Sequence, residues 1–212
     1  MKIRRTANAG VLLQLDDVSF LLDGVCREVD PYPATPPQIR SALANSPADV
    51  LGFTHSHLDH YDPDFAADYL QAGGVIFGPE DIPGALPEER LTVGGVTITA
   101  IPSRHIGKAG GVAHNSFILE GSRCVWFVGD AAPLQWKETG LKKPDVLIAP
   151  YAYANSRLGW EITKQLTDRL VLLHLPEQGK DPFGLWEQVQ TCITGDPSVK
   201  VYIPKIGEEL AL

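Results

Sequence analysis

The segment from Thr54 to His60, with the sequence THSHLDH, concentrates side chains that can bind metal ions: three of the six histidines of the chain and one aspartate. Imidazole and carboxylate groups bind Zn²⁺ and other first-row divalent ions. His55 and His57 are two positions apart, so in an extended segment their imidazoles leave the same side, whereas Asp59 and His60 follow in a turn and can face elsewhere. One segment can therefore serve two ions. The alternative is a polar loop of solvated histidines, but four ligand-type side chains in six positions favour a metal site.

Three later residues, His105, Asp130 and His174, each lie at or just beyond the end of an apolar, strand-like run. Taken singly, the two histidines would be hydrogen-bonded structural residues and the aspartate would cap a turn or a helix. Strand ends can converge in a sandwich of two sheets, however. Together with the THSHLDH segment, these three residues strengthen the prediction of a metal site.

The elements that position these residues are short strands and a few helices. Alternating or continuous apolar patterns predict strands at 2–6, 10–15, 18–23, 49–53, 75–77, 115–119, 124–128, 145–149, 171–173 and 200–203, with two more between 91 and 101 around Gly94-Gly95. Helical spacing and end signals predict helices at 36–44, with Thr35 as its N-cap, from Asp62-Pro63 to Gly73-Gly74, at 155–170 and at 182–193. Two sheets packed together with helices outside would suit this order. No repeat, linker or low-complexity tract divides the chain, which predicts one domain over residues 1–212.

Composition excludes several classes of protein. A net charge of −8 and a pI near 5.2 disfavour attraction to nucleic acid or to an anionic membrane. Cys26, Cys124 and Cys192 are far apart and form no CxxC pair, so we expect buried thiols in a reducing compartment. The apolar runs are much shorter than the roughly 20 residues of a membrane span, and the first residues lack the apolar core of a signal peptide. These features predict a cytoplasmic protein.

The motif THSHLDH, followed in order by His105, Gly129-Asp130 and His174, resembles the metallo-β-lactamase fold superfamily over essentially the whole chain. The resemblance implies an α/β (α+β) fold, a four-layer αββα sandwich with a two-metal site at one edge. By that match, the first metal would be held by His55, His57 and His105, the second by Asp59, His60 and His174, and Asp130 would bridge them.

The residues around the motif indicate a branch of the superfamily. The run THSHLDHYDP resembles the branch of the ascorbate-6-phosphate lactonase, whereas branches resembling glyoxalase II usually continue the motif with glycine. Ala131 stands where that lactonase branch often has threonine, so a hydroxyl neighbour of the bridging aspartate is missing. Oxygen-reducing di-iron relatives tend to have glutamate in place of His57, and no flavin-binding segment is visible.

Several nearby residues are candidates for the substrate pocket. His114 could be a proton donor or an oxyanion contact, or only a polar loop residue. Arg104, Lys108 and Lys180 would favour an anionic substrate, unless they are solvated loop charges. The cleft could also be lined by Tyr151, Tyr153 and Asn155. The alternative is that these side chains only pack against their neighbours.

These observations predict a binuclear metal-dependent hydrolase of a small ester, lactone or phosphoester. An anionic substrate is one option. A hydroxide bridging two divalent ions, Zn²⁺ first with Mn²⁺ or Fe as alternatives, would be the nucleophile, and Asp59 would orient it. The partner would be a small-molecule substrate, with no nucleic acid or membrane. Two rivals stay open: an RNA- or DNA-processing nuclease, and a non-catalytic metal or ligand sensor on the same fold. The sequence does not indicate an oligomeric state.

Overall fold

The computed structural model describes residues 1–107, 111–137 and 140–212 and contains two sheets packed face to face. Within these residues, the first sheet has seven strands, in the order β14 (Glu209–Ala211), β1 (Lys2–Arg5), β2 (Val11–Leu15), β3 (Val18–Leu22), β4 (Val50–Gly52), β5 (Ile76–Phe77) and β6 (Ala85–Leu86). The second also has seven, in the order β13 (Lys200–Tyr202), β12 (Arg169–Leu173), β11 (Val146–Pro150), β10 (Cys124–Phe127), β9 (Asn115–Glu120), β8 (Val96–Pro102) and β7 (Arg90–Val93).

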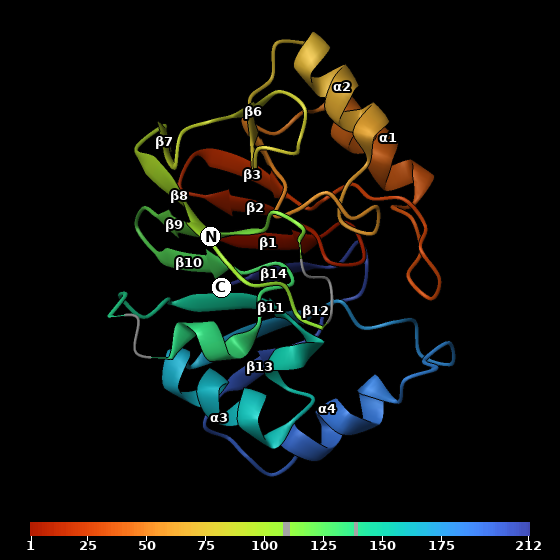
Figure 1. Ribbon diagram of the computed structural model, residues 1–212, viewed down its shortest axis with the longest axis vertical. Helices are drawn as coiled ribbons and strands as arrows, with labels where there is room; N and C mark the ends of the chain where they lie inside the picture. Colours follow the sequence, from red (N-terminus) through yellow and green to blue (C-terminus); the bar gives the residue numbers. More distant parts are fainter. Residues whose placement is uncertain (108–110, 138–139) are drawn as a thin grey trace.

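Helices cover the outer faces of both sheets. The helices α1 (Pro37–Asn45) and α2 (Pro63–Gln71) lie outside the first sheet, and α3 (Arg157–Leu166) and α4 (Leu185–Ile193) lie outside the second (Figure 1). Two short 3₁₀ helices, η1 (Pro133–Trp136) and η2 (Tyr151–Tyr153), follow β10 and β11. The predicted αββα sandwich is therefore confirmed. No helix in the described part of the chain is both long and apolar enough to cross a membrane.

Three apolar clusters match these layers. The central cluster lies between the sheets and includes Phe20, Phe117 and Phe127, all at most 1% exposed. A second cluster lies between the second sheet and α3 and α4, and a third between the first sheet and α1 and α2. Burial of these apolar surfaces is the main force that holds the layers together. Cys26 and Cys124 are buried free thiols, as predicted, and Cys192 is partly buried.

Most differences from the predicted elements lie at their ends. The helix predicted to run to residue 170 ends at Leu166, because Thr167 is extended and its hydroxyl accepts the backbone N–H of Arg169, where β12 begins. Pro36, not Thr35, is the N-cap residue of α1; the Thr35 hydroxyl accepts from the backbone N–H of Cys26 instead. The helix predicted from residue 182 begins at 185, after Gly184 with a left-handed backbone.

The helix that follows the histidine-rich segment begins as predicted. The Asp62 carboxylate accepts the backbone N–H groups of Asp64 and Phe65, and Pro63 occupies the first turn. Such a cap satisfies two amides that have no partner within the helix. The loop that carries the histidines is thus fixed at both ends, by β4 before it and by this cap after it.

Candidate metal centre

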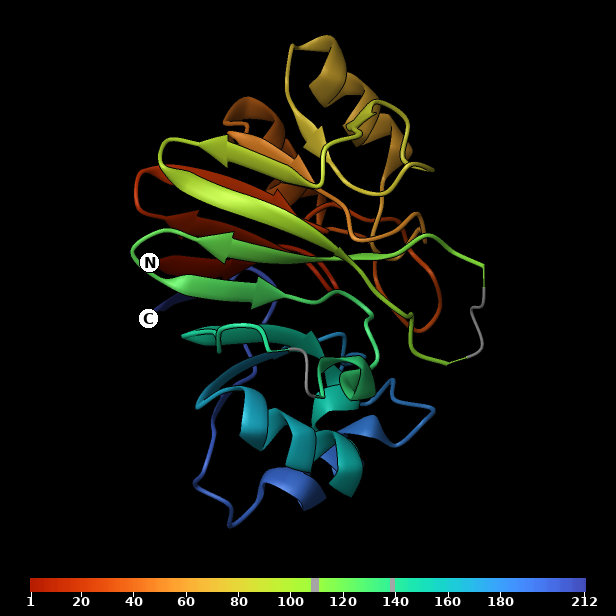
Figure 2. The same cartoon turned by 60° about the vertical axis from the view of Figure 1, so that its left-hand side comes forward.

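The predicted ligands lie in loops that follow strands and meet at one edge of the sandwich. His55 follows β4, His105 follows β8, Asp130 follows β10, and His174 comes directly after β12. Figure 2 shows the carboxyl ends of β10 and β11 pointing toward this edge, where the long loops gather. Since the carboxyl ends of neighbouring parallel strands lie at the same sheet edge, the fold brings together residues that are far apart in the sequence.

The structure gathers six of the predicted ligands into two trios. In the first trio, His55, His57 and His105 each offer a ligand atom, and these atoms lie within 4.8 Å of one another. In the second trio, Asp59, His60 and His174 do the same within the same distance. Each trio has the composition that the resemblance implies for one of the two metals.

Asp130 lies between the trios. Its Oδ2 atom is 3.5 Å from the Nε2 atoms of His60, His105 and His174. One carboxylate therefore faces histidines of both trios, which is the position that a bridging ligand needs. The backbone before it requires glycine, because Gly129 has a φ of +53° and an added Cβ would lie 2.5 Å from the Thr54 Oγ1 atom.

Buried atoms without partners show that these residues fit a metal. Among the described residues, no hydrogen-bond partner reaches the buried Nε2 atoms of His55, His60, His105 and His174, or the Oδ1 atom of Asp130. Buried polar atoms of this kind are costly and are normally satisfied. Nitrogen lone pairs and carboxylate oxygens that converge in this way are the donor set that divalent transition metals bind.

The partners of the Nδ1 atoms explain why the Nε2 atoms are free to bind. The Nδ1 atom of His105 lies 2.6 Å from the carbonyl oxygen of Ile106, to which only an N–H can donate. The hydroxyl of Thr54 donates to Asp23, so it accepts from Nδ1 of His55, 3.0 Å away. In both rings the proton is therefore on Nδ1, and Nε2 keeps its lone pair.

Asp23 is a site residue that the sequence analysis missed. Its carboxylate is fully buried, lies 2.8 Å from Nδ1 of His60, and accepts the backbone N–H and the hydroxyl of Thr54. A carboxylate that holds the far nitrogen of a metal-binding histidine fixes the orientation of the ring and raises its basicity. The available signal was its place at the end of the apolar run 18–23, like the other site residues.

Left-handed backbone conformations in residues other than glycine also concentrate here. Asp23 has a φ of +45° and His174 a φ of +59°, and the third such residue among those described, Asp16, lies in the β2–β3 turn. Such conformations cost free energy and persist where the surrounding structure enforces them. The site is therefore held by the fold in a geometry that its own backbone does not favour.

Electrostatic effects leave most of the set in the protonation states that metals bind. Burial, and next the charge of His60, lowers the pKa of His55, and burial also lowers the pKa of His57. Burial would raise the pKa of Asp130, but the charges of His174 and His60 outweigh it and hold that pKa well below its usual value. His60 differs: burial opposes its charge, but Asp130 and Asp23 raise its pKa. A bound cation would take over that compensating charge.

His114 lies next to the ligands without belonging to either trio. Its ring centre is 5.0 Å from that of His55, its Nε2 accepts the backbone N–H of Asp130 at 3.0 Å, and its Nδ1 is 2.7 Å from the Ser103 hydroxyl. The residue is 4% exposed. Burial is the main cause that lowers the pKa of His114 to about 3, so the ring is neutral.

The other candidate pocket residues have different surroundings. Lys180 is exposed and pairs with Glu177 at 2.9 Å, and Arg104 is exposed as well. Lys108 lies outside the described residues. The prediction of an anionic substrate remains untested by these positions.

Aromatic side chains surround His174. The ring of Tyr151 is 5.9 Å from that of His174, and Tyr32, which the sequence analysis did not select, is closer at 4.3 Å. Tyr153 is fully buried and its hydroxyl accepts the indole N–H of Trp136, which agrees with the packing alternative. The side chain of Asn155 donates to Gln188.

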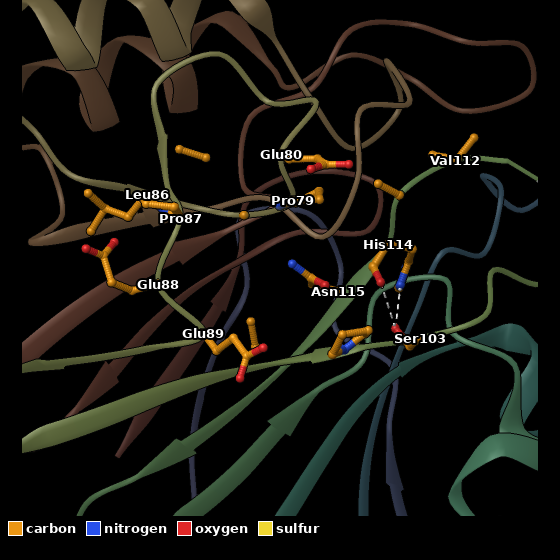
Figure 3. A pocket seen from close by; sticks show the side chains of 15 residues that line it. Pro79, Glu80, Leu86, Pro87, Glu88, Glu89, Ser103, Val112, His114 and Asn115 are labelled. Atoms are coloured by element: carbon orange, nitrogen blue, oxygen red, sulfur yellow. Dashed lines mark hydrogen bonds between the residues drawn. The ribbon is translucent and has the colours of Figure 1, made fainter.

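A cavity of about 680 Å³ extends from His114 (Figure 3). Its walls come from the segments after β5, around β6, at the end of β8 and at the start of β9. Three glutamates, Glu80, Glu88 and Glu89, lie along it, and its described lining contains no lysine or arginine. It is large enough for a small organic molecule.

Comparison with known proteins agrees with this fold. The profile of a family described as "Beta-lactamase superfamily domain" matches residues 12–174, a range that contains all seven predicted ligands. Comparison with curated protein sequences gave no match.

Three solved structures are similar over nearly their whole length. A possible metal-dependent hydrolase from Veillonella parvula has a TM-score of 0.73 at 19% identity, covering 100% of this chain and 99% of that one. Igni18, a metallo hydrolase from Ignicoccus hospitalis, has a TM-score of 0.68 at 19% identity, with 99% and 97% covered. The isothiocyanate hydrolase from Delia radicum gut bacteria has a TM-score of 0.68 at 17% identity, with 100% and 99% covered. At these identities the similarity establishes a shared fold.

Proposed function

The chain belongs to the beta-lactamase superfamily, and from this premise we propose that it is a binuclear metal-dependent hydrolase of small esters, lactones or phosphoesters. One observation carries the proposal: the Asp130 carboxylate faces histidines of both trios, whose buried Nε2 atoms have no hydrogen-bond partner among the described residues. A fold that only displays histidines on its surface would not bury unsatisfied nitrogens around a single carboxylate.

Each trio would hold one divalent ion, with Asp130 shared between them. Zn²⁺ suits four-coordinate imidazole and carboxylate sites, and the same donors accept Mn²⁺ or Fe. When bound, such a pair of ions supplies an activated water molecule at neutral pH and positive charge for a developing oxyanion.

Asp59 is the residue we propose to orient the attacking water. Its side chain is 14% exposed, more than that of His174, which is 5% exposed. The Oδ2 atom of Asp59 lies 3.3 Å from Nε2 of His174. Burial would raise the pKa of Asp59, but the nearby imidazole of His174 and the charge of His60 outweigh it, so the pKa is lowered. An ionised, partly exposed carboxylate can accept a hydrogen bond from water while it holds a metal.

The cavity beside His114 suits the part of the substrate that does not react. Its glutamates disfavour a negatively charged group there, so we propose a neutral or cationic substituent on that side. The anionic group predicted from Arg104, Lys108 and Lys180 would have to lie elsewhere in the cleft. The related isothiocyanate hydrolase adds another carbon electrophile to the candidate substrates.

The test combines metal analysis with a substrate panel. Purified protein, reconstituted with Zn²⁺, Mn²⁺ or Fe²⁺, is analysed for metal and assayed on p-nitrophenyl acetate, a sugar-phosphate lactone, an isothiocyanate and bis-p-nitrophenyl phosphate. We expect about two ions per chain and turnover that His57→Ala greatly reduces. One ion or fewer per chain would contradict the binuclear proposal.

The same panel, together with an RNA-binding assay, separates the rivals. Tight metal binding without turnover on any member would indicate a sensor. Salt-sensitive RNA binding together with phosphodiester cleavage would indicate a nuclease. Preference for the sugar-phosphate lactone would support the lactonase-like branch.

A further inference from the structure

We propose that His114 is a positioning residue, a neutral hydrogen-bond acceptor that fixes the turn carrying Asp130, and that it does not donate a proton to the substrate. This inference rests on the proposed metal site, but it concerns the support of that site and not the reaction. It decides between the roles that the sequence leaves open for this residue.

The first step is the contact with Asp130. The backbone N–H of Asp130 donates to Nε2 of His114 at 3.0 Å. A backbone amide can only donate, so Nε2 carries no proton and the proton of the neutral ring is on Nδ1. The nitrogen that faces Asp130 is therefore already used as an acceptor.

The second step is an independent assignment from the other side of the ring. The Ser116 hydroxyl donates to the carbonyl of Val128 at 2.9 Å, so it accepts from Ser103, 3.0 Å away. The Ser103 hydroxyl has then used its proton as well and accepts from Nδ1 of His114 at 2.7 Å. The hydroxyl chain thus places the ring proton on Nδ1, in agreement with the contact at Asp130.

The third step is where this series of hydrogen bonds begins and ends. It starts at the N–H of Asp130 and returns to the carbonyl of Val128, so it spans the turn whose middle residue is Gly129. That glycine has a left-handed backbone, a conformation from which the chain can readily relax. His114 and the two serines therefore hold both sides of the turn that aims the Asp130 carboxylate at both trios.

The surroundings leave no proton-donor role for the ring. Both nitrogens have partners and the residue is 4% exposed. Figure 3 shows His114 and Ser103 at the wall of the cavity, joined by their hydrogen bond. A substrate in the cavity can touch the ring, but it meets neither a free N–H nor a free lone pair.

Two variants of similar size separate the roles. In His114→Gln the amide oxygen can occupy the position of Nε2 and accept from Asp130, whereas in His114→Asn the amide nitrogen can occupy that of Nδ1 and donate to Ser103. Co²⁺ affinity by competition with a chelator, and the visible spectrum of the Co²⁺ protein, are measured with kcat and KM. Asn115→Ala, which changes the same cavity wall without touching Asp130, is the matched control.

We expect His114→Gln to keep Co²⁺ affinity within about threefold and to keep the spectrum, and His114→Asn to lose about 10- to 100-fold in affinity with an altered spectrum. Asn115→Ala should leave the affinity unchanged. If both His114 variants keep the wild-type spectrum and affinity while kcat falls equally, the residue is a proton donor and the proposal is wrong. Equal loss of affinity in both would overturn the acceptor assignment.

Ser103→Ala provides a second measurement if either His114 variant fails to fold. It removes the hydroxyl that fixes the ring, so we expect a smaller loss of Co²⁺ affinity in the same direction, about two- to fivefold. An unchanged affinity would refute the hydroxyl chain. Because metal affinity is measured without a substrate, these results are informative even if the protein proves not to be a hydrolase.

Discussion

The two ligand trios are supported in different ways. Two histidines of the first trio, His55 and His105, rest on uncharged groups, the Thr54 hydroxyl and the Ile106 carbonyl, with the neutral His114 beside them. The second trio contains a carboxylate of its own, and His60 rests on the buried carboxylate of Asp23. Two metals in one cleft would therefore experience unequal charge. We expect the second trio to bind its ion more tightly, because it combines more negative charge with the stronger support.

The largest effect should come from Asp130, the residue that faces both trios. Asp130→Asn replaces a shared anion by a neutral amide, which should lower metal content below one ion per chain and activity by about 10³-fold. Metal analysis and kcat/KM on the best panel substrate check this. Loss of only one ion would mean that the Asp130 carboxylate serves a single trio.

Asp23→Asn should weaken metal binding selectively at the second trio. Loss of the carboxylate behind His60 should weaken one of the two ions by about 10- to 100-fold and leave the other within a few fold, as measured by stepwise Co²⁺ titration. Asp62→Asn is the control, because the Asp62 side chain is largely buried at 10% exposure, serves as a helix cap where asparagine is equally suitable, and touches no ligand. Equal weakening of both ions by Asp23→Asn would remove the distinction between the trios.

The pH dependence of stability should reveal the neutral His114 beside the first trio. The pKa of His114 in the folded protein is about 3, below its unfolded value near 6.5, so below pH 6.5 the unfolded chain binds a proton that the folded chain does not. This residue therefore destabilises the metal-free protein progressively as pH falls from 6.5 toward 3, by about 2 kcal/mol at pH 5. Urea unfolding of wild type and His114→Gln between pH 7 and 5 measures the difference. A parallel pH dependence of the two proteins would contradict the expected shift.

The smallest effect should come from Lys180, in the loop that follows His174. Its ammonium group is exposed and already paired with Glu177, so Lys180→Ala should leave stability nearly unchanged and change KM by less than about twofold. Steady-state kinetics on neutral and anionic substrates test this. A clear rise of KM for anionic substrates alone would restore Lys180 as a binding residue.

The convergence of the candidate ligands could be predicted from sequence because their types and order are specific and each follows a strand. For Asp23 the local signal, its place at the end of an apolar run, was not sufficient, since its relation to the site depends on the register of two strands. β3 and β4 run parallel with Leu22 opposite Gly52, which brings Asp23 beside Thr54, 31 residues later. No local pattern encodes such a pairing. The role of His114 likewise appears only when the ends of β8, β9 and β10 are placed together.

The missed structural elements have a similar origin. β14 is three residues long and includes Glu209, so it has no apolar signal of its own, and it forms by pairing with β1 from the other end of the chain. The end of α3 was predicted too late because Leu170 continues its apolar spacing, whereas the extended backbone at Thr167 ends the helix. For β14, a contact formed elsewhere in the fold decided the local structure.

If the proposed ions bind, the buried imidazole nitrogens that have no hydrogen-bond partner among the described residues would link the lifetime of the protein to the supply of metal. An ion that binds only the folded chain adds to its stability, whereas the metal-free chain must keep unsatisfied groups and left-handed residues at the same edge. In a cell starved of metal, the protein is therefore expected to unfold more often and to be degraded faster by proteases. Its abundance would then follow metal availability without any dedicated regulator.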